Sequence, residues 1–167
     1  MGIEIERKFR VVGEGWRAQA SRSVRMAQGY INDMAALREA RQNASVRVRI
    51  AGDAAFLNLK SREPGHTRQE FDYAIPVADA EALLALCVGG RIDKLRHYVV
   101  HAGHTWEVDE FAGDNAGLVV AELELASADE AFERPAWLGR EVTDETRWYN
   151  LALAERPYSR WSAQEKT

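Results

Sequence analysis

The chain has 167 residues, of which 46% are hydrophobic and 29% charged, and its formal net charge at pH 7 is −4. These values are typical of a soluble globular protein, and the length predicts a single domain over residues 1–167 with a sizeable core. The acidic balance argues against a nonspecific nucleic-acid binder, which needs a net basic surface, but it allows a local basic pocket. Cys87 is the only cysteine, so an intrachain disulfide is excluded.

The N-terminal residues 1–6 contain no apolar segment of the kind found in signal peptides, and no apolar run reaches the length of a membrane span. We therefore expect a cytoplasmic protein without a membrane partner. Cys87 lies in the apolar stretch 83–88, which predicts a buried structural thiol and not a nucleophile.

Most of the chain alternates between apolar and polar residues with a period of two, which indicates half-buried strands. In chain order the alternating stretches are residues 3–12, 23–32 (the weakest), 45–51, 55–61, 67–76, 91–100, 104–111 and 118–126. Turn-forming pairs such as Gly52-Asp53 and Pro64-Gly65 separate several of them. About eight strands at hairpin spacing favour a mainly β (α+β) fold with an antiparallel sheet or barrel.

Four other stretches predict short helices. They are residues 13–21 around Trp16, the polar and Ala-rich residues 34–43, residues 78–88 with Asp79 as the cap, and residues 145–155, which stop before Pro157.

Charged residues recur at alternate positions, so they share one face of the expected sheet. The opposite face is almost wholly apolar. The charged face carries eight acids and seven bases: Glu4, Glu6, Glu70, Asp72, Glu107, Asp109, Glu122 and Glu124, and Lys8, Arg47, Arg49, Lys60, Arg68, Lys94 and Arg96.

On any one strand, exposure to solvent explains such a face. The whole set favours a ligand, because Thr, Ser and Gln are scarce on it and charges of one sign gather on the same strand. Cross-strand neighbours of like charge repel by roughly 0.2–1 kcal/mol. In a barrel with this face inward, anionic oxygens would meet the bases, and hard divalent ions such as Mg²⁺ or Mn²⁺ would meet the acids. A polyphosphate with bridging metal ions would satisfy both the basic and the acidic residues of this face.

The segment Glu4-Ile5-Glu6-Arg7-Lys8 resembles the E-x-E-x-K signature of the CYTH superfamily, the triphosphate tunnel metalloenzymes. Further motifs are similar to those of that family and follow the same order over residues 3–125; they are residues 46–50, 59–60, 68–70, 94–98, 107–109 and 122–124. Residues 137–143 and 147–150 are similar to the ending of its short bacterial members. The resemblance implies an eight-stranded antiparallel tunnel with a few covering helices, which hydrolyses or cyclises triphosphates with two metal ions. Residues 34–44 depart from the pattern, and we expect them to alter the tunnel mouth and substrate choice.

The resemblance also implies roles for single residues. Glu4, Glu122 and Glu124 would hold the metal ion that bridges the phosphates, Glu6 a second ion that activates water, and Asp109 and Glu70 are further candidates beside the metal ions. The bases that would bind phosphate oxygens are Arg47, Arg49, Lys60, Lys94 and Arg96, with Lys8 beside the phosphates. Glu6, Lys8 and Lys94 are the candidate catalytic residues.

We therefore predict Mg²⁺- or Mn²⁺-dependent hydrolysis of a small triphosphate, inorganic tripolyphosphate first. A class IV-type adenylate cyclase that makes cyclic AMP and pyrophosphate from ATP, and a noncatalytic polyphosphate-binding module, are the alternatives. The short C-terminus favours the hydrolase, and the acidic set favours an enzyme. The oligomeric state, a homodimer included, stays open. We expect His101 and His104 to be solvated turn residues and not zinc ligands, since they flank Ala102-Gly103.

Overall fold

The structure is a computed structural model that describes residues 5–61 and 69–167. Within these ranges the chain forms one antiparallel sheet of nine strands. The strands are β1 (Ile5–Val11), β2 (Ala20–Tyr30), β3 (Ala44–Ala51), β4 (Ala54–Ser61), β5 (Glu70–Ile75), β6 (Ile92–His101), β7 (His104–Phe111), β8 (Val119–Leu125) and β9 (Leu138–Glu141).

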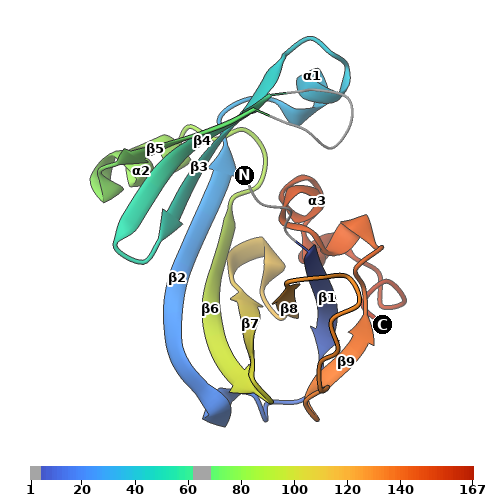
Figure 1. Ribbon diagram of the computed structural model, residues 1–167. Coiled ribbons are helices and arrows are strands. Elements are labelled where there is room, and N and C mark those ends of the chain that lie inside the picture. Colours follow the sequence, from blue (N-terminus) through green and yellow to red (C-terminus); the bar gives the residue numbers. More distant parts are fainter. Residues whose placement is uncertain (1–4, 62–68) are drawn as a thin grey trace.

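The strand order across the sheet is β5-β4-β3-β2-β6-β7-β8-β1-β9. The long strand β2 pairs with β6 over most of its length but with β3 only from Met26 to Tyr30. The strands β3, β4 and β5 therefore form a wing that leans away from the other strands. Figure 1 shows the remaining strands curling into a cup, with the wing above it.

The predicted mainly β, antiparallel fold is confirmed, and all eight expected strands are present. Two details of the expected tunnel need correction over the described residues: the sheet has a ninth strand, β9, and it is open, with β5 and β9 as its edges. A four-residue strand is too short to show alternation in the sequence. The edges stay apart because the wing leans away from the cup.

The helices are short. They are α1 (Met34–Arg38), α2 (Val77–Leu84) and α3 (Asn150–Glu155), with 3₁₀ turns η1 (Arg17–Gln19), η2 (Gly113–Asn115), η3 (Thr146–Trp148) and η4 (Tyr158–Arg160). The elements α1, α3, η1 and η3 lie inside the predicted stretches, α2 begins one residue before its stretch, and η2 and η4 were not predicted. The predicted cap of the second helix is wrong. Pro76 occupies the N-cap position without a side-chain bond, and Asp79 lies in the first turn, where its charge favours the helix dipole.

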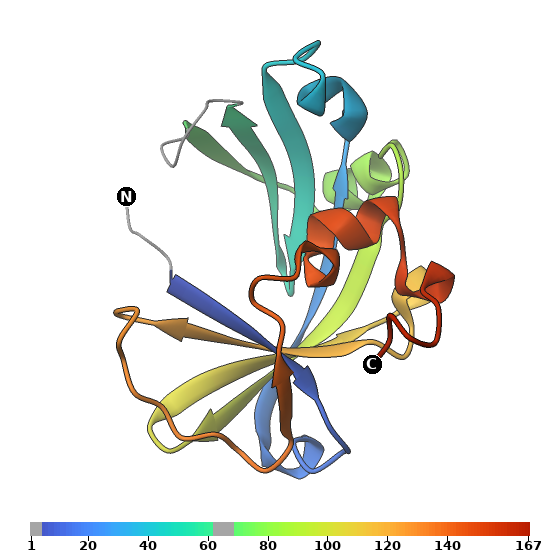
Figure 2. The same cartoon turned by 90° about the vertical axis from the view of Figure 1, so that its right-hand side faces the viewer.

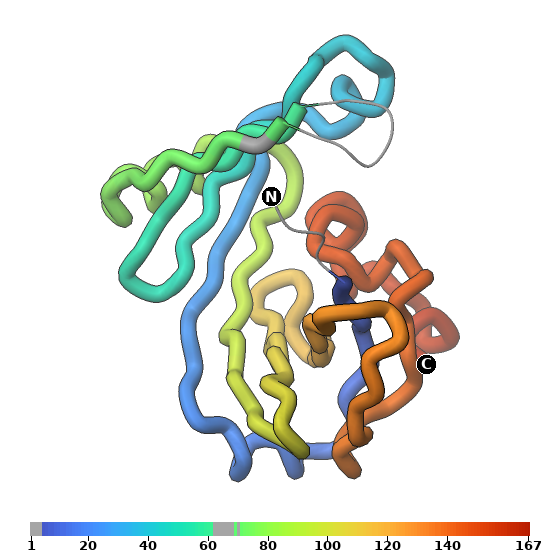
Figure 3. Tube along the Cα trace, viewed as in Figure 1, coloured from blue at the N-terminus to red at the C-terminus, as the bar shows by residue number. Residues whose placement is uncertain are grey.

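Three apolar clusters hold the sheet. On the outer face of the cup, Phe9, Trp106 and Leu123 pack under Trp16 and Trp137. Trp137 ends the irregular connection between β8 and β9, and Figure 3 draws this connection in orange. The outer face of the wing packs against α2 through a second cluster. These two clusters confirm that the apolar face points outward under covering segments.

The third cluster lies on the inner face, at one end of the cup, on the face that the sequence predicted to be charged. There, Trp148 and Leu153 of the C-terminal segment pack against Ile92, Phe111 and Val120. These strand residues share the inner face with the charged residues of the same strands, as the cross-strand register shows. The C-terminal segment therefore fills part of the cup. In Figure 2 its helix α3 is drawn in orange-red.

Cys87 packs against β2 at Gly29. A Cβ atom on Gly29 would lie 2.7 Å from Cys87 Sγ, so only glycine permits this approach. The thiol is half-buried, and burial raises its pKa, which fits a structural role.

No helix in the described ranges has the length and apolar character that crossing a bilayer requires.

Candidate active site

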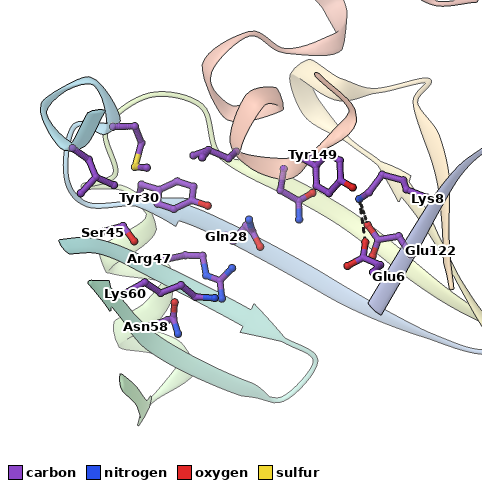
Figure 4. A pocket seen from close by; sticks show the side chains of 14 residues that line it. Glu6, Lys8, Gln28, Tyr30, Ser45, Arg47, Asn58, Lys60, Glu122 and Tyr149 are labelled. Atoms are coloured by element: carbon purple, nitrogen blue, oxygen red, sulfur yellow. Dashed lines mark hydrogen bonds and ion pairs between the residues drawn. The ribbon is translucent and has the colours of Figure 1, made fainter. Parts of the chain in front are cut away.

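A cavity of about 460 Å³ lies on the inner face of the sheet, and residues of the cup and of the wing line it. Figure 4 shows two groups of side chains that face one another across it. The acidic side, which β1 and β8 carry, consists of Glu6, Lys8 and Glu122, with Tyr149 next to them. The basic side, which β3 and β4 carry, presents Arg47 and Lys60 with Asn58.

The register of β1 and β8 builds the acidic side. Lys8 lies opposite Glu122 and Glu6 opposite Glu124, so these four side chains share the inner face. The Lys8 side chain is 3% exposed, and its ammonium forms an ion pair with Glu122 and lies 3.5 Å from a Glu6 oxygen. It also lies 4.4 Å from the centroid of the Tyr149 ring. One buried ammonium therefore stands among two carboxylates and an aromatic face.

The register of β2, β3 and β4 builds the basic side. Arg47 lies opposite Tyr30 on one neighbouring strand and Asn58 on the other, and the Lys60 side chain points to the same face. The Nε atoms of Arg47 and Arg49 are buried and lack a hydrogen-bond partner among the described residues. Buried donors of this kind are costly unless a partner satisfies them, and phosphate oxygens are good partners for a guanidinium.

Next to the cavity, an ion-pair network joins β6, β7 and β8. Asp109 is fully buried and pairs with Lys94. Arg96 donates from Nε and Nη2 to the two Asp109 oxygens, at 2.7 Å each, and from Nη2 to Glu122 at 2.7 Å. It also pairs with Glu107. Lys94 and Arg96 are therefore already engaged by carboxylates.

Burial and neighbouring charges raise the pKa of some carboxyl groups on this face and lower that of others. Burial raises the pKa of Glu6, and the nearby Glu122 charge adds to the rise. Burial likewise raises the pKa of Glu107. Burial alone would also raise the pKa of Asp109 and Glu122, but the cations around them, Lys94 foremost, outweigh it, so both pKa values lie below their ordinary values.

The cavity brings five of the predicted site residues together: Glu6, Lys8, Arg47, Lys60 and Glu122. Arg49, Lys94, Arg96, Asp109 and Glu124 share their face but do not line this cavity. Glu124 is exposed, and Glu4 lies outside the described residues.

Tyr149, Asn150 and Leu151 also line the cavity, and none of them is among the predicted site residues. They follow no strand alternation that could have marked them. Met34 and Leu37 of α1 also line it, which places the predicted departure at residues 34–44 beside the site.

The acidic side has the oxygen donors that hard divalent ions prefer. Glu6 and Glu122 are close enough to raise the Glu6 pKa, and a cation between such carboxylates would relieve their repulsion. The described side chains alone form no group of three or more acidic, histidine or cysteine residues that encloses a metal ion. The donor chemistry fits a divalent ion, with Glu4 beyond the described residues.

His101 and His104 do not line this cavity. His104 Nε2 is 3.0 Å from Glu130, and His101 Nε2 is 3.5 Å from Glu133. The two histidines flank the Ala102-Gly103 turn, as predicted, but their side chains are only 20% and 27% exposed and are therefore less solvated than expected. The connection between β8 and β9 supplies both glutamates and folds against the hairpin.

The model of the CYTH domain matches residues 2–156 of this chain. The chain is 43% identical over 159 residues to an inorganic triphosphatase of Acetivibrio thermocellus, covering 95% of this chain and 97% of the relative. It is 37% identical over 158 residues to an inorganic triphosphatase of Nitrosomonas europaea, covering 90% and 96%. The crystal structure of the inorganic triphosphatase NE1496 superposes with a TM-score of 0.74 at 34% identity, covering 92% of this chain and 95% of that one.

Proposed function

This chain belongs to the CYTH domain family, and we propose on that premise that it hydrolyses inorganic tripolyphosphate with the help of divalent metal ions. Its two inorganic triphosphatase relatives match it over nearly their whole length, which supports a triphosphate hydrolase. The observation that carries the proposal is the opposition of Glu6 and Glu122 to Arg47 and Lys60 across one cavity. A polyphosphate with metal ions needs both sides at once.

The basic side binds the phosphate chain in this scheme. Arg47 and Arg49 have buried Nε donors without partners in the described chain, which suits them to phosphate oxygens, and Lys60 adds a third positive charge. Lys8 stands where its ammonium can meet the phosphate group nearest the carboxylates. Lys94 and Arg96 act mainly by holding Asp109 and Glu122 in place and by adding positive potential.

The acidic side would hold the metal ions, through Glu6 and Glu122, with Glu4 and Glu124 from the neighbouring positions. Bound divalent ions would supply charge neutralisation and a water molecule of lowered pKa. The chain itself orients the triphosphate between its two charged sides, which is most of what phosphoryl transfer requires from a protein.

The test is phosphate release by the purified protein from tripolyphosphate, ATP and thiamine triphosphate, with Mg²⁺ or Mn²⁺ and with excess EDTA. Cyclic AMP is measured in parallel. We expect tripolyphosphate to be cleaved fastest, little cyclic AMP, and no turnover in EDTA.

A matched pair of variants ties the activity to this cavity. Lys60→Gln should lower kcat/KM for tripolyphosphate about tenfold to a hundredfold, as expected for loss of a charge-assisted contact of roughly 1.5–3 kcal/mol. Arg25→Gln changes a half-exposed arginine of β2 that pairs with Glu81 of α2, and it should leave the kinetics unchanged. Cyclic AMP as the main product would establish the cyclase, and binding of tripolyphosphate without turnover would establish the binding module.

A further inference from the structure

The residues that follow β9 hold Lys8 by its backbone. The Lys8 N–H group donates to Thr143 Oγ1 at 3.0 Å, and the Val142 N–H group donates to the Lys8 carbonyl at 2.8 Å. Thr143 is itself fixed, because its hydroxyl donates to Glu141 at 2.7 Å. The C-terminal segment therefore sets the position of Lys8 on β1 from the side opposite β8.

The same segment also reaches the Lys8 ammonium. The Tyr149 ring lies 4.4 Å from Nζ, and the Tyr149 hydroxyl donates to the Thr143 carbonyl at 2.7 Å. Figure 4 shows Tyr149 beside Lys8, above the Glu6 and Glu122 carboxylates. The ring is thus anchored at its far end and presents its face to the charge.

The balance of forces on the ammonium explains what the ring does. Glu122 and Glu6 both attract the ammonium toward the acidic side. With almost no water around it, the group has no other polar partner of comparable strength among the described residues. An aromatic face attracts a desolvated cation more strongly than a solvated one. The Tyr149 ring therefore attracts the ammonium from a side different from that of the two carboxylates.

Resting on the proposed function, we infer that Tyr149 is a positioning residue for triphosphate hydrolysis. Its ring holds the Lys8 ammonium where it meets the phosphate oxygens, and the Tyr149–Thr143 hydrogen bond keeps the ring in place. Tyr149 touches no reacting atom in this scheme and acts through Lys8. The C-terminal segment is then a working part of the active site as well as a cover for the sheet.

A double-mutant cycle tests the inference, with Lys8→Met, Tyr149→Leu and the double variant assayed on tripolyphosphate. Tyr149→Leu should lower kcat/KM about 3- to 30-fold, the range that corresponds to a partly to fully desolvated cation–π contact. In the Lys8→Met background the same change should have less than a twofold effect, because the residue through which Tyr149 acts is absent. Equal losses in both backgrounds would refute the inference.

Tyr149→Phe separates the ring from the hydroxyl. It keeps the aromatic face and should stay within about threefold of the wild-type kcat/KM, above Tyr149→Leu. A loss in Tyr149→Phe as large as in Tyr149→Leu would show that the ring face does not matter. Tyr158→Leu is the matched control, because Tyr158 faces the Lys166 ammonium at 4.6 Å but lies outside the cavity.

The Lys8 Hε chemical shift reports the contact without reference to activity. The ring current of Tyr149 should shift this signal upfield in the wild type and in Tyr149→Phe, and the shift should vanish in Tyr149→Leu. Wild-type protein that fails to hydrolyse tripolyphosphate would refute the proposed function. A Lys8 signal that Tyr149→Leu leaves unmoved would refute the positioning role alone.

Discussion

The guanidinium of Arg96 on β6 reaches across β7 and donates a hydrogen bond of 2.7 Å to Glu122 on β8. On the way it meets both Asp109 oxygens and pairs with Glu107, so one cation serves three carboxylates. Such a residue is as much a part of the fold as of the site. Arg96 therefore differs from Arg47, whose Nε has no partner in the described chain.

The main effect of replacing Arg96 should be a loss of folding stability. Arg96→Met leaves buried carboxylates with too little positive charge, and breaking a buried ion pair from one side costs roughly 3–5 kcal/mol. Arg41→Gln is the control, since Arg41 pairs with Glu39 on the surface and such pairs contribute about 0–1 kcal/mol. Urea denaturation of both variants at pH 7 measures the difference. Equal stability of the two would mean that the network contributes nothing to the fold.

The pH dependence of stability should separate two carboxylates that lie two residues apart on β7. The pKa of Asp109 is lowered in the fold, so its contribution is present above its unfolded value of about 3.8 and is lost as the pH falls through the folded pKa. The pKa of Glu107 is raised from 4.5, so the folded state binds its proton more tightly and loses stability as the pH rises above about 4.5.

Neutral substitutions read out these opposite signs in metal-free buffer. Relative to wild type, Asp109→Asn should lose stability as the pH rises from 3 to 5, whereas Glu107→Gln should gain stability as it rises from 4.5 to 7. The measurement is the free energy of unfolding at each pH. Curves for the two variants that change in the same direction would contradict the assigned burial and ion pairing.

The sequence predicted which face of the sheet the charged site residues of the described strands share, but not their partners. Alternation alone places Lys8, Arg47 and Glu122 on one surface, because side chains alternate strictly along a strand. It cannot tell that Arg96 ends among three carboxylates while Arg47 faces an open cavity, since that depends on strand order and sheet curvature. Tyr149 was beyond sequence reasoning for a similar reason: it lies between a 3₁₀ turn and a short helix, and only the packing of Trp148 and Leu153 brings it to Lys8.

The apolar residues that line the cavity should influence kcat/KM for organic triphosphates more than kcat/KM for tripolyphosphate. Met34 and Leu37 of α1 line the cavity, and an inorganic anion gains nothing from apolar contact. Met34→Ala with Leu37→Ala should therefore leave kcat/KM for tripolyphosphate within about twofold and change that for ATP several-fold, since single apolar contacts are worth about 1–3 kcal/mol in discrimination. Kinetics on both substrates measure the ratio. An unchanged ratio would remove residues 34–44 from substrate choice.

Glu6→Gln and Arg47→Ala should fail in different ways, because the two residues stand on opposite sides of the cavity. Glu6 is assigned to the metal ion that activates water, so its loss should lower kcat with little change in KM, the pattern of an interaction used only in the transition state. Glutamine keeps the size of glutamate, and burial disfavours the charge that the substitution removes, so the protein should stay folded.

Arg47 is assigned to a phosphate oxygen in both the ground state and the transition state. Its removal should raise KM about tenfold to a hundredfold, as expected for a charge-assisted contact of roughly 1.5–3 kcal/mol. Steady-state kinetics of both variants, with circular dichroism as the check on folding, decides the matter: wild-type kinetics in both folded variants would place the active site elsewhere on the sheet.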